Sequence, residues 1–65
     1  MTRTFTALIH KEDDWYVATC VEVGTVSQGK DTEEALRNLQ EATELYLEEF
    51  PVEDTDRALV TTFEV

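Results

Sequence analysis

The 65-residue sequence contains one cysteine, one histidine, one proline and two glycines. A single cysteine, Cys20, excludes an internal disulfide, and a structural zinc site normally needs several cysteine or histidine ligands. No apolar run approaches the ~20 residues that a membrane span needs, and the N-terminal residues lack the apolar segment of a secretory signal. We therefore expect a cytoplasmic protein with no disulfide, no structural metal and no membrane association.

Basic residues are also scarce. Five Lys and Arg stand against 15 Asp and Glu, which gives a net charge of −10, and residues 31–56 alone hold ten acids and one base. Charge of this sign repels the phosphates of nucleic acids and attracts basic protein surfaces. We therefore expect no direct binding of nucleic acid. The excess charge is equally consistent with a solubilising face or with adaptation to a salty cytoplasm.

Four segments are predicted to be strands. Residues 3–11 are rich in β-branched and aromatic types and lack glycine and proline, and strands are also predicted at residues 15–23 and 25–29, with the polar residues 11–14 as a hairpin loop. The C-terminal segment RALVTTFEV, residues 57–65, alternates Leu59, Thr61, Phe63 and Val65 against the residues between them and predicts a fourth strand.

A long amphipathic helix is predicted between the third and fourth strands. Asp31 is a favourable N-cap, Glu34 stands where a capping box requires it, and Pro51 ends the helix. The order β-β-β-α-β predicts one α+β domain over residues 1–65. A right-handed crossover gives a mixed four-stranded sheet of order 3-2-1-4 with one helix on one face.

One helix covers only one face of such a sheet. The other face is predicted to expose an apolar patch, and soluble monomers rarely expose large patches of this kind. We therefore expect a homodimer or a tetramer. The predicted interface consists of Leu8, Tyr16, Ala18 and Cys20.

No known catalytic arrangement is present. His10 is predicted at the surface, and Cys20 lies among small and apolar residues with no basic neighbour to activate it. A Mg²⁺-dependent nuclease of the ribonuclease H type is disfavoured, because residues 3–11 contain no acid. We therefore expect no enzyme activity, no catalytic residue, no metal and no cofactor.

Several short motifs occur together in a fixed order. YVA with Cys20 is followed by SQG at residues 27–29, TEEAL at residues 32–36 and ELYLEE at residues 44–49. In this order the chain resembles the HicB-like antitoxin family, from about Thr4 to Phe50. The resemblance implies a truncated ribonuclease-H-like fold without nuclease activity. It also implies a type II toxin–antitoxin partner, a small basic HicA-like toxin that cleaves mRNA and whose site the antitoxin covers.

Two surfaces are candidates for contact with such a partner. They consist of Glu41, Glu44, Leu45 and Glu48 on the helix, and of Asp13, Asp14 and Trp15 at the hairpin. Many members of the family carry a C-terminal DNA-binding domain, for which a chain ending at Val65 has no room. An alternative is therefore a toxin-independent regulatory module that oligomerises and recruits a separate DNA-binding chain.

Overall fold

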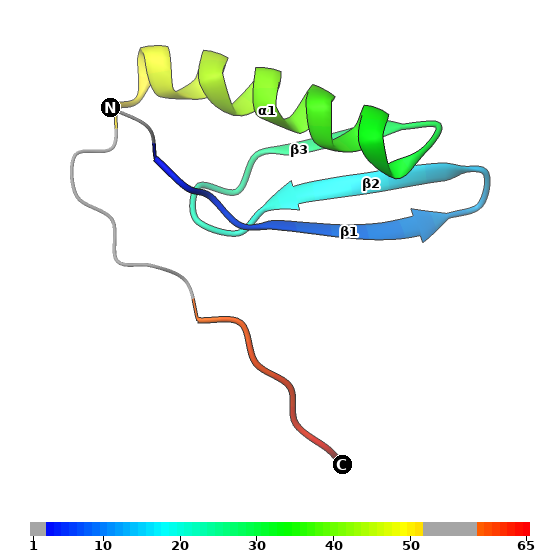
Figure 1. Ribbon diagram of the computed structural model, residues 1–65. Helices are drawn as coiled ribbons and strands as arrows, with labels where there is room; N and C mark the ends of the chain where they lie inside the picture. Colours follow the sequence, from blue (N-terminus) through cyan, green and yellow to red (C-terminus); the bar gives the residue numbers. More distant parts are fainter. Residues whose placement is uncertain (1–2, 52–58) are drawn as a thin grey trace.

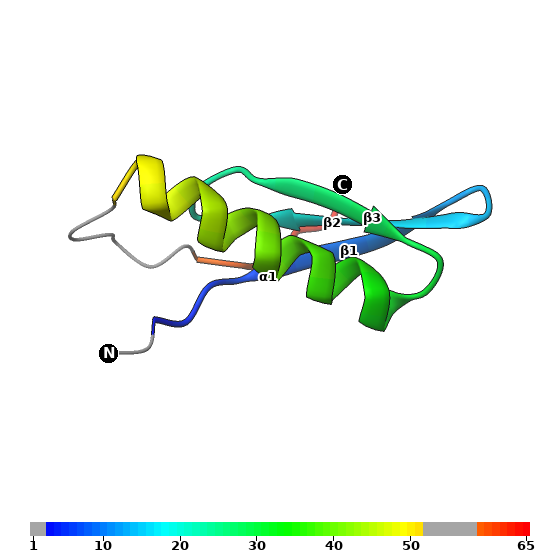
Figure 2. The ribbon, with the colours of Figure 1, turned by 90° about the horizontal axis from the view of Figure 1, so that it is seen from above.

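The computed structural model describes residues 3–51 and 59–65, and it contains three strands and one helix in the order β-β-β-α. The strands form one antiparallel sheet of order β1-β2-β3. The helix lies across one face of this sheet (Figures 1 and 2). The elements are β1 Ala7–Glu12, β2 Trp15–Cys20, β3 Val26–Gly29 and α1 Thr32–Glu49.

The predicted fourth strand is wrong, and with it the mixed four-stranded sheet of order 3-2-1-4. Residues 59–65 form no strand, and they extend away from the sheet (Figure 1). Residues 57 and 58 lie outside the described part of the chain. Alternation reports a local preference for extended backbone, whereas a strand also needs a partner that is distant in sequence. The truncated ribonuclease-H-like arrangement implied by the resemblance includes this strand and is not formed.

A two-residue turn, Asp13–Asp14, joins β1 and β2 and fixes their register. Glu12 pairs with Trp15 on either side of the turn, and Leu8 pairs with Thr19 further along. Asp13 has a φ of 54°, in the left-handed region that Asp tolerates better than most residues. The sequence prediction of a hairpin here is confirmed.

The start of α1 is fixed by two side-chain hydrogen bonds. The Glu34 backbone N–H donates to Asp31 Oδ1 at 2.7 Å, which confirms Asp31 as the N-cap. The Glu34 carboxylate accepts from the Lys30 N–H at 2.7 Å, one residue earlier than in the standard capping box. Within residues 3–51 and 59–65, no helix has the length and apolar character of a membrane span.

The core lies between α1 and the sheet and is small. Its buried hydrophobic residues in the described part of the chain are Ala18, Cys20, Ala35 and Leu39. Hydrogen bonds at the edge of this core attach the helix to the strands. Asn38 Nδ2 donates to the Gln28 carbonyl at 2.9 Å, and the hydroxyls of Thr25 and Thr43 lie 2.7 Å apart.

Glu22 holds the loop after β2 against the N-terminal end of β1. Its carboxylate accepts from the Thr6 backbone N–H at 2.7 Å and from the Thr6 hydroxyl at 2.8 Å. These hydrogen bonds favour the charged form and lower the pKa of Glu22.

We expect Glu22→Gln to destabilise the fold in a pH-dependent way. Because the folded-state pKa lies below the ordinary value, the charged carboxylate stabilises the fold above that value. The stabilisation is lost as the pH falls through the folded-state pKa. The urea midpoint of the natural protein should exceed that of the variant above about pH 5, and the difference should shrink below about pH 4. An equal difference at every pH would contradict the role of the charge, and Glu64→Gln, at an exposed position, serves as the control.

Candidate protein-binding surfaces

The outward side of α1 carries a compact acidic surface, called the acidic face here and consisting of Glu41, Glu44, Leu45 and Glu48. All four residues are exposed, and Leu45 is 60% exposed. Their spacings of three and four residues make them neighbours on the helix surface, on the side opposite the buried Leu39 and Thr43. The structure therefore brings together the four helix residues predicted from the sequence.

This arrangement is unfavourable for the helix itself. Acids three and four residues apart repel one another by a few tenths of a kcal/mol per pair. Glu48 and Glu49 lie in the last turn, where the helix dipole favours basic residues, and that turn contains none. The acidic face therefore lowers the stability of α1 locally, and packing against the sheet does not use it.

The second predicted contact set lies at the other end of the molecule. Asp13 and Asp14 form the exposed tip of the β1–β2 hairpin, near the end where α1 begins, whereas Glu48 lies near the end where α1 finishes (Figure 1). Trp15 follows the tip and is 44% exposed. The positive φ of Asp13 gives this residue a role in the turn itself. The helix set and the hairpin set are therefore two separate surfaces.

The four residues predicted for the oligomer interface do not lie on one surface. Tyr16, Ala18 and Cys20 point towards α1, and Ala18 and Cys20 are already buried beneath it. Leu8 pairs with Thr19, so it points to the opposite face.

Another apolar surface lies on the side of the sheet that α1 leaves uncovered. We call it the open sheet face. Its residues are the apolar side chains and Thr19 that the strand pairing places on the same face as Leu8. No helix or strand covers it within the described parts of the chain (Figure 1). It consists of Leu8, Trp15, Val17, Thr19 and Val26.

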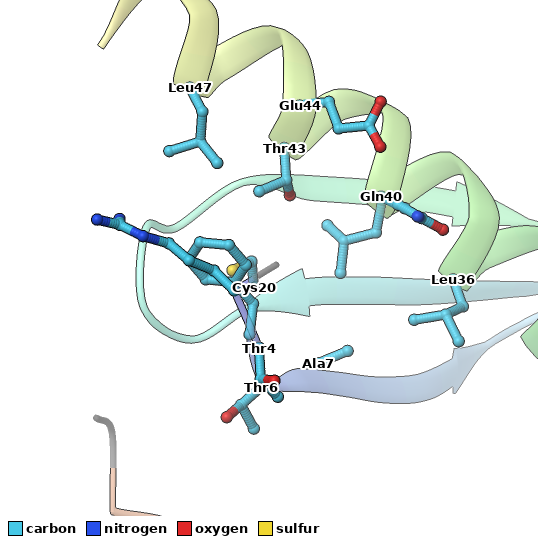
Figure 3. A pocket seen from close by; sticks show the side chains of 12 residues that line it. Thr4, Thr6, Ala7, Cys20, Leu36, Gln40, Thr43, Glu44 and Leu47 are labelled. Carbon is cyan, nitrogen blue, oxygen red and sulfur yellow. The ribbon is translucent and has the colours of Figure 1, made fainter. Parts of the chain in front are cut away.

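Sequence reasoning missed a groove of about 720 Å³ between α1 and the N-terminal end of β1. The buried Cys20 and Leu39 line it, together with Phe5. Figure 3 shows Ala7 on the side of β1 and Leu36 and Leu47 on the side of α1. The remaining lining residues are Arg3, Thr4, Thr6, Gln40, Thr43 and Glu44. The signal in the sequence was the apolar flank of the helix, which includes Leu36 and Leu47.

Of the titratable side chains of the sheet, Cys20 lines the groove, whereas His10 and Glu12 do not. His10 Nε2 lies 3.4 Å from Glu12 Oε2, and both side chains are exposed on the same side of β1 as Leu8. The Cys20 thiol is buried and donates to Glu22 Oε1 at 3.7 Å. Among residues 3–51 and 59–65, no three His, Cys, Asp or Glu side chains are grouped so that they could hold a metal ion.

Comparison with known proteins places the chain in a family. Residues 4–64 match the family described as "Family of unknown function (DUF7387)". The chain belongs to DUF7387. A UPF0150 protein of Helicobacter pylori is 55% identical over 42 residues, which are 63% of this chain and 58% of that protein. This DUF7387 chain thus spans less than two thirds of the relative's length. No solved structure matches this chain significantly.

Proposed function

We propose that this DUF7387 member is a HicB-like antitoxin that binds a small basic HicA-type toxin and covers its RNA-cleaving site. The acidic face of α1 is the observation that carries the proposal. It places three glutamates around the exposed Leu45, on a helix whose stability they lower. The motif order of the HicB-like family, from about Thr4 to Phe50, supports the same assignment.

Charge gives this surface its mechanism. A protein that cleaves RNA needs a cationic surface for the phosphates, and carboxylates on a helix compete with phosphates for such a surface. Opposite charges also accelerate the encounter of the two proteins. Leu45, which lies beside Glu41 and Glu48 on the helix surface, supplies apolar contact that excludes water from an interface. In this proposal the chain acts in the cytoplasm by contact alone and catalyses no reaction.

The open sheet face favours a second candidate function. Leu8, Trp15 and Val26 are large apolar side chains and are at least 44% exposed. A regulatory module that oligomerises and recruits a separate DNA-binding chain would use such a surface. A basic DNA-binding protein encoded beside this chain, and bound by it, would favour this candidate over the antitoxin.

Co-expression tests the antitoxin proposal. The small basic protein encoded by the adjacent reading frame should arrest growth when expressed alone, and this chain should restore growth. The variant Glu41→Lys/Glu44→Lys/Glu48→Lys should fail to restore it, although the fold is retained, because lysines in the last turns suit the helix dipole. Circular dichroism checks that the variant is folded.

The control variant is Glu12→Lys/Glu33→Lys/Glu64→Lys, which makes the same change in net charge at exposed positions outside both candidate contact surfaces. It should restore growth like the natural chain. The proposal fails if the neighbouring protein is neither toxic nor bound. It fails equally if the control variant, and not the helix variant, loses the ability to restore growth.

A further inference from the structure

The C-terminal residues 59–65, called the arm here, are apolar and lack contacts that bury them. Leu59 is 88% exposed and Phe63 is 86% exposed. Figure 1 shows the arm extended away from the sheet. In an extended chain alternate side chains point to one side, so Leu59, Thr61, Phe63 and Val65 share one side of the arm. The arm therefore has the pattern of a strand that packs one side on an apolar surface, but it lies in solvent.

The groove beside β1 offers such a surface. β1 is an edge strand, because the sheet has the order β1-β2-β3. An edge strand has an unpaired row of backbone donors and acceptors. Above this edge α1 overhangs the groove and presents Leu36, which is 47% exposed, and Leu47 (Figure 3). Ala7 is the residue of this strand edge that lines the groove, so the groove combines the start of the unpaired edge with an apolar wall.

The arm is long enough to fill the groove. Leu36 and Leu47 are eleven positions apart on α1, which is about 16 Å along the helix axis. The arm of seven residues spans about 20 Å when extended. Its only charged side chain is Glu64, and the groove is lined by one basic residue, Arg3, and one acidic residue, Glu44. Length and apolar character, not charge, therefore match the arm to the groove.

We infer that the groove is a binding site for an extended apolar segment, and that its occupant is the arm of a second copy of this chain. The chain's own arm lies outside its own groove in the structure (Figure 1). Only four hydrophobic residues are buried within the described parts of the chain, and small domains with so little core commonly depend on oligomerisation. In a two-fold dimer, the arm of each copy would lie in the groove of the other, so that both grooves are filled and both arms are covered.

This inference does not rest on the proposed function, because it needs no toxin, and Glu44 is the one groove residue that also belongs to the acidic face. Sedimentation of the purified full chain over a range of concentrations should show a dimer of twice 7.5 kDa. Phe63→Asp in the arm and Leu36→Asp in the groove should each raise the dissociation constant of the dimer at least tenfold. Thr62→Asp is the matched control, because Thr62 lies on the other side of the arm, and it should change the constant little.

A mixture of the two defective variants distinguishes exchange from its alternatives. In a mixed dimer the intact arm of the Leu36→Asp chain meets the intact groove of the Phe63→Asp chain, so association should be partly restored. If the mixture associates no better than either variant alone, the arm does not occupy the groove of another copy, and the inference is wrong. It is also wrong if the natural protein sediments at 7.5 kDa at every concentration. Dimers that persist in Phe63→Asp would assign the contact to another surface, such as the open sheet face.

Discussion

Leu39→Ala is expected to leave the isolated chain largely unfolded at 25 °C. Leu39 is 4% exposed and is the largest of the four buried hydrophobic residues in the described part of the chain. Truncation of a buried leucine costs about 2–5 kcal/mol, because burial is lost and a cavity remains. A domain of this size rarely gains more than about 3–5 kcal/mol from its core. One substitution therefore removes most of the stability that the fold has.

Leu45→Ala is the matched control, since it makes the same change on the same helix at a residue that is 60% exposed. It should change the free energy of unfolding by less than about 0.5 kcal/mol. Urea denaturation followed by circular dichroism measures both variants. If Leu39→Ala costs no more than Leu45→Ala, the core is not the one described here.

Gly29→Ala is expected to destabilise the fold by about 1–3 kcal/mol, because the added methyl group has no space. A Cβ at position 29 would lie 2.5 Å from the Ala35 nitrogen and 2.8 Å from the Glu34 carbonyl carbon. Both are backbone atoms of the first turn of α1, so relief requires the whole helix start to move away from β3. The absence of a side chain at Gly29 therefore allows the first turn of α1 to pack closely against β3.

Gly24→Ala separates this effect from the general cost of replacing a glycine. Gly24 has a φ of 85°, and a Cβ there would meet nothing within 4 Å. Its replacement should cost about 1 kcal/mol, from the left-handed backbone alone. Thermal unfolding of the two variants should place Gly29→Ala clearly below Gly24→Ala. The reverse order would show that helix and sheet do not approach as closely as described.

Local chemistry made much of the fold predictable. The helix start depends on Asp31 and Glu34, which are three residues apart and satisfy backbone donors close to themselves in sequence. The helix faces follow from the spacing of Leu39 and Thr43 against Glu41 and Leu45. For the same reason the acidic face could be identified residue by residue before the fold was known.

Long-range pairing was not predictable in the same way. The alternation of residues 59–65 is compatible with an extended segment in any location. The local sequence does not determine whether another strand pairs with it, or which one. The interface prediction grouped Leu8 with Cys20, whereas the pairing of Leu8 with Thr19 places the two side chains on opposite faces of the sheet. Since side chains alternate between faces, the face of each residue depends on the exact register of the strands. The groove was missed because it depends on another long-range contact, the position of α1 relative to the N-terminal end of β1.

Binding of the proposed partner, a purified small basic HicA-type toxin, measured by calorimetry at low and high salt, tests whether the acidic face is the binding surface. The natural chain should bind, and its affinity should fall as salt rises. Glu41→Lys/Glu44→Lys/Glu48→Lys should lose several kcal/mol, about 100-fold or more in affinity, because like charges then face one another. Equal affinity of this variant and the natural chain at low salt would contradict the proposed function.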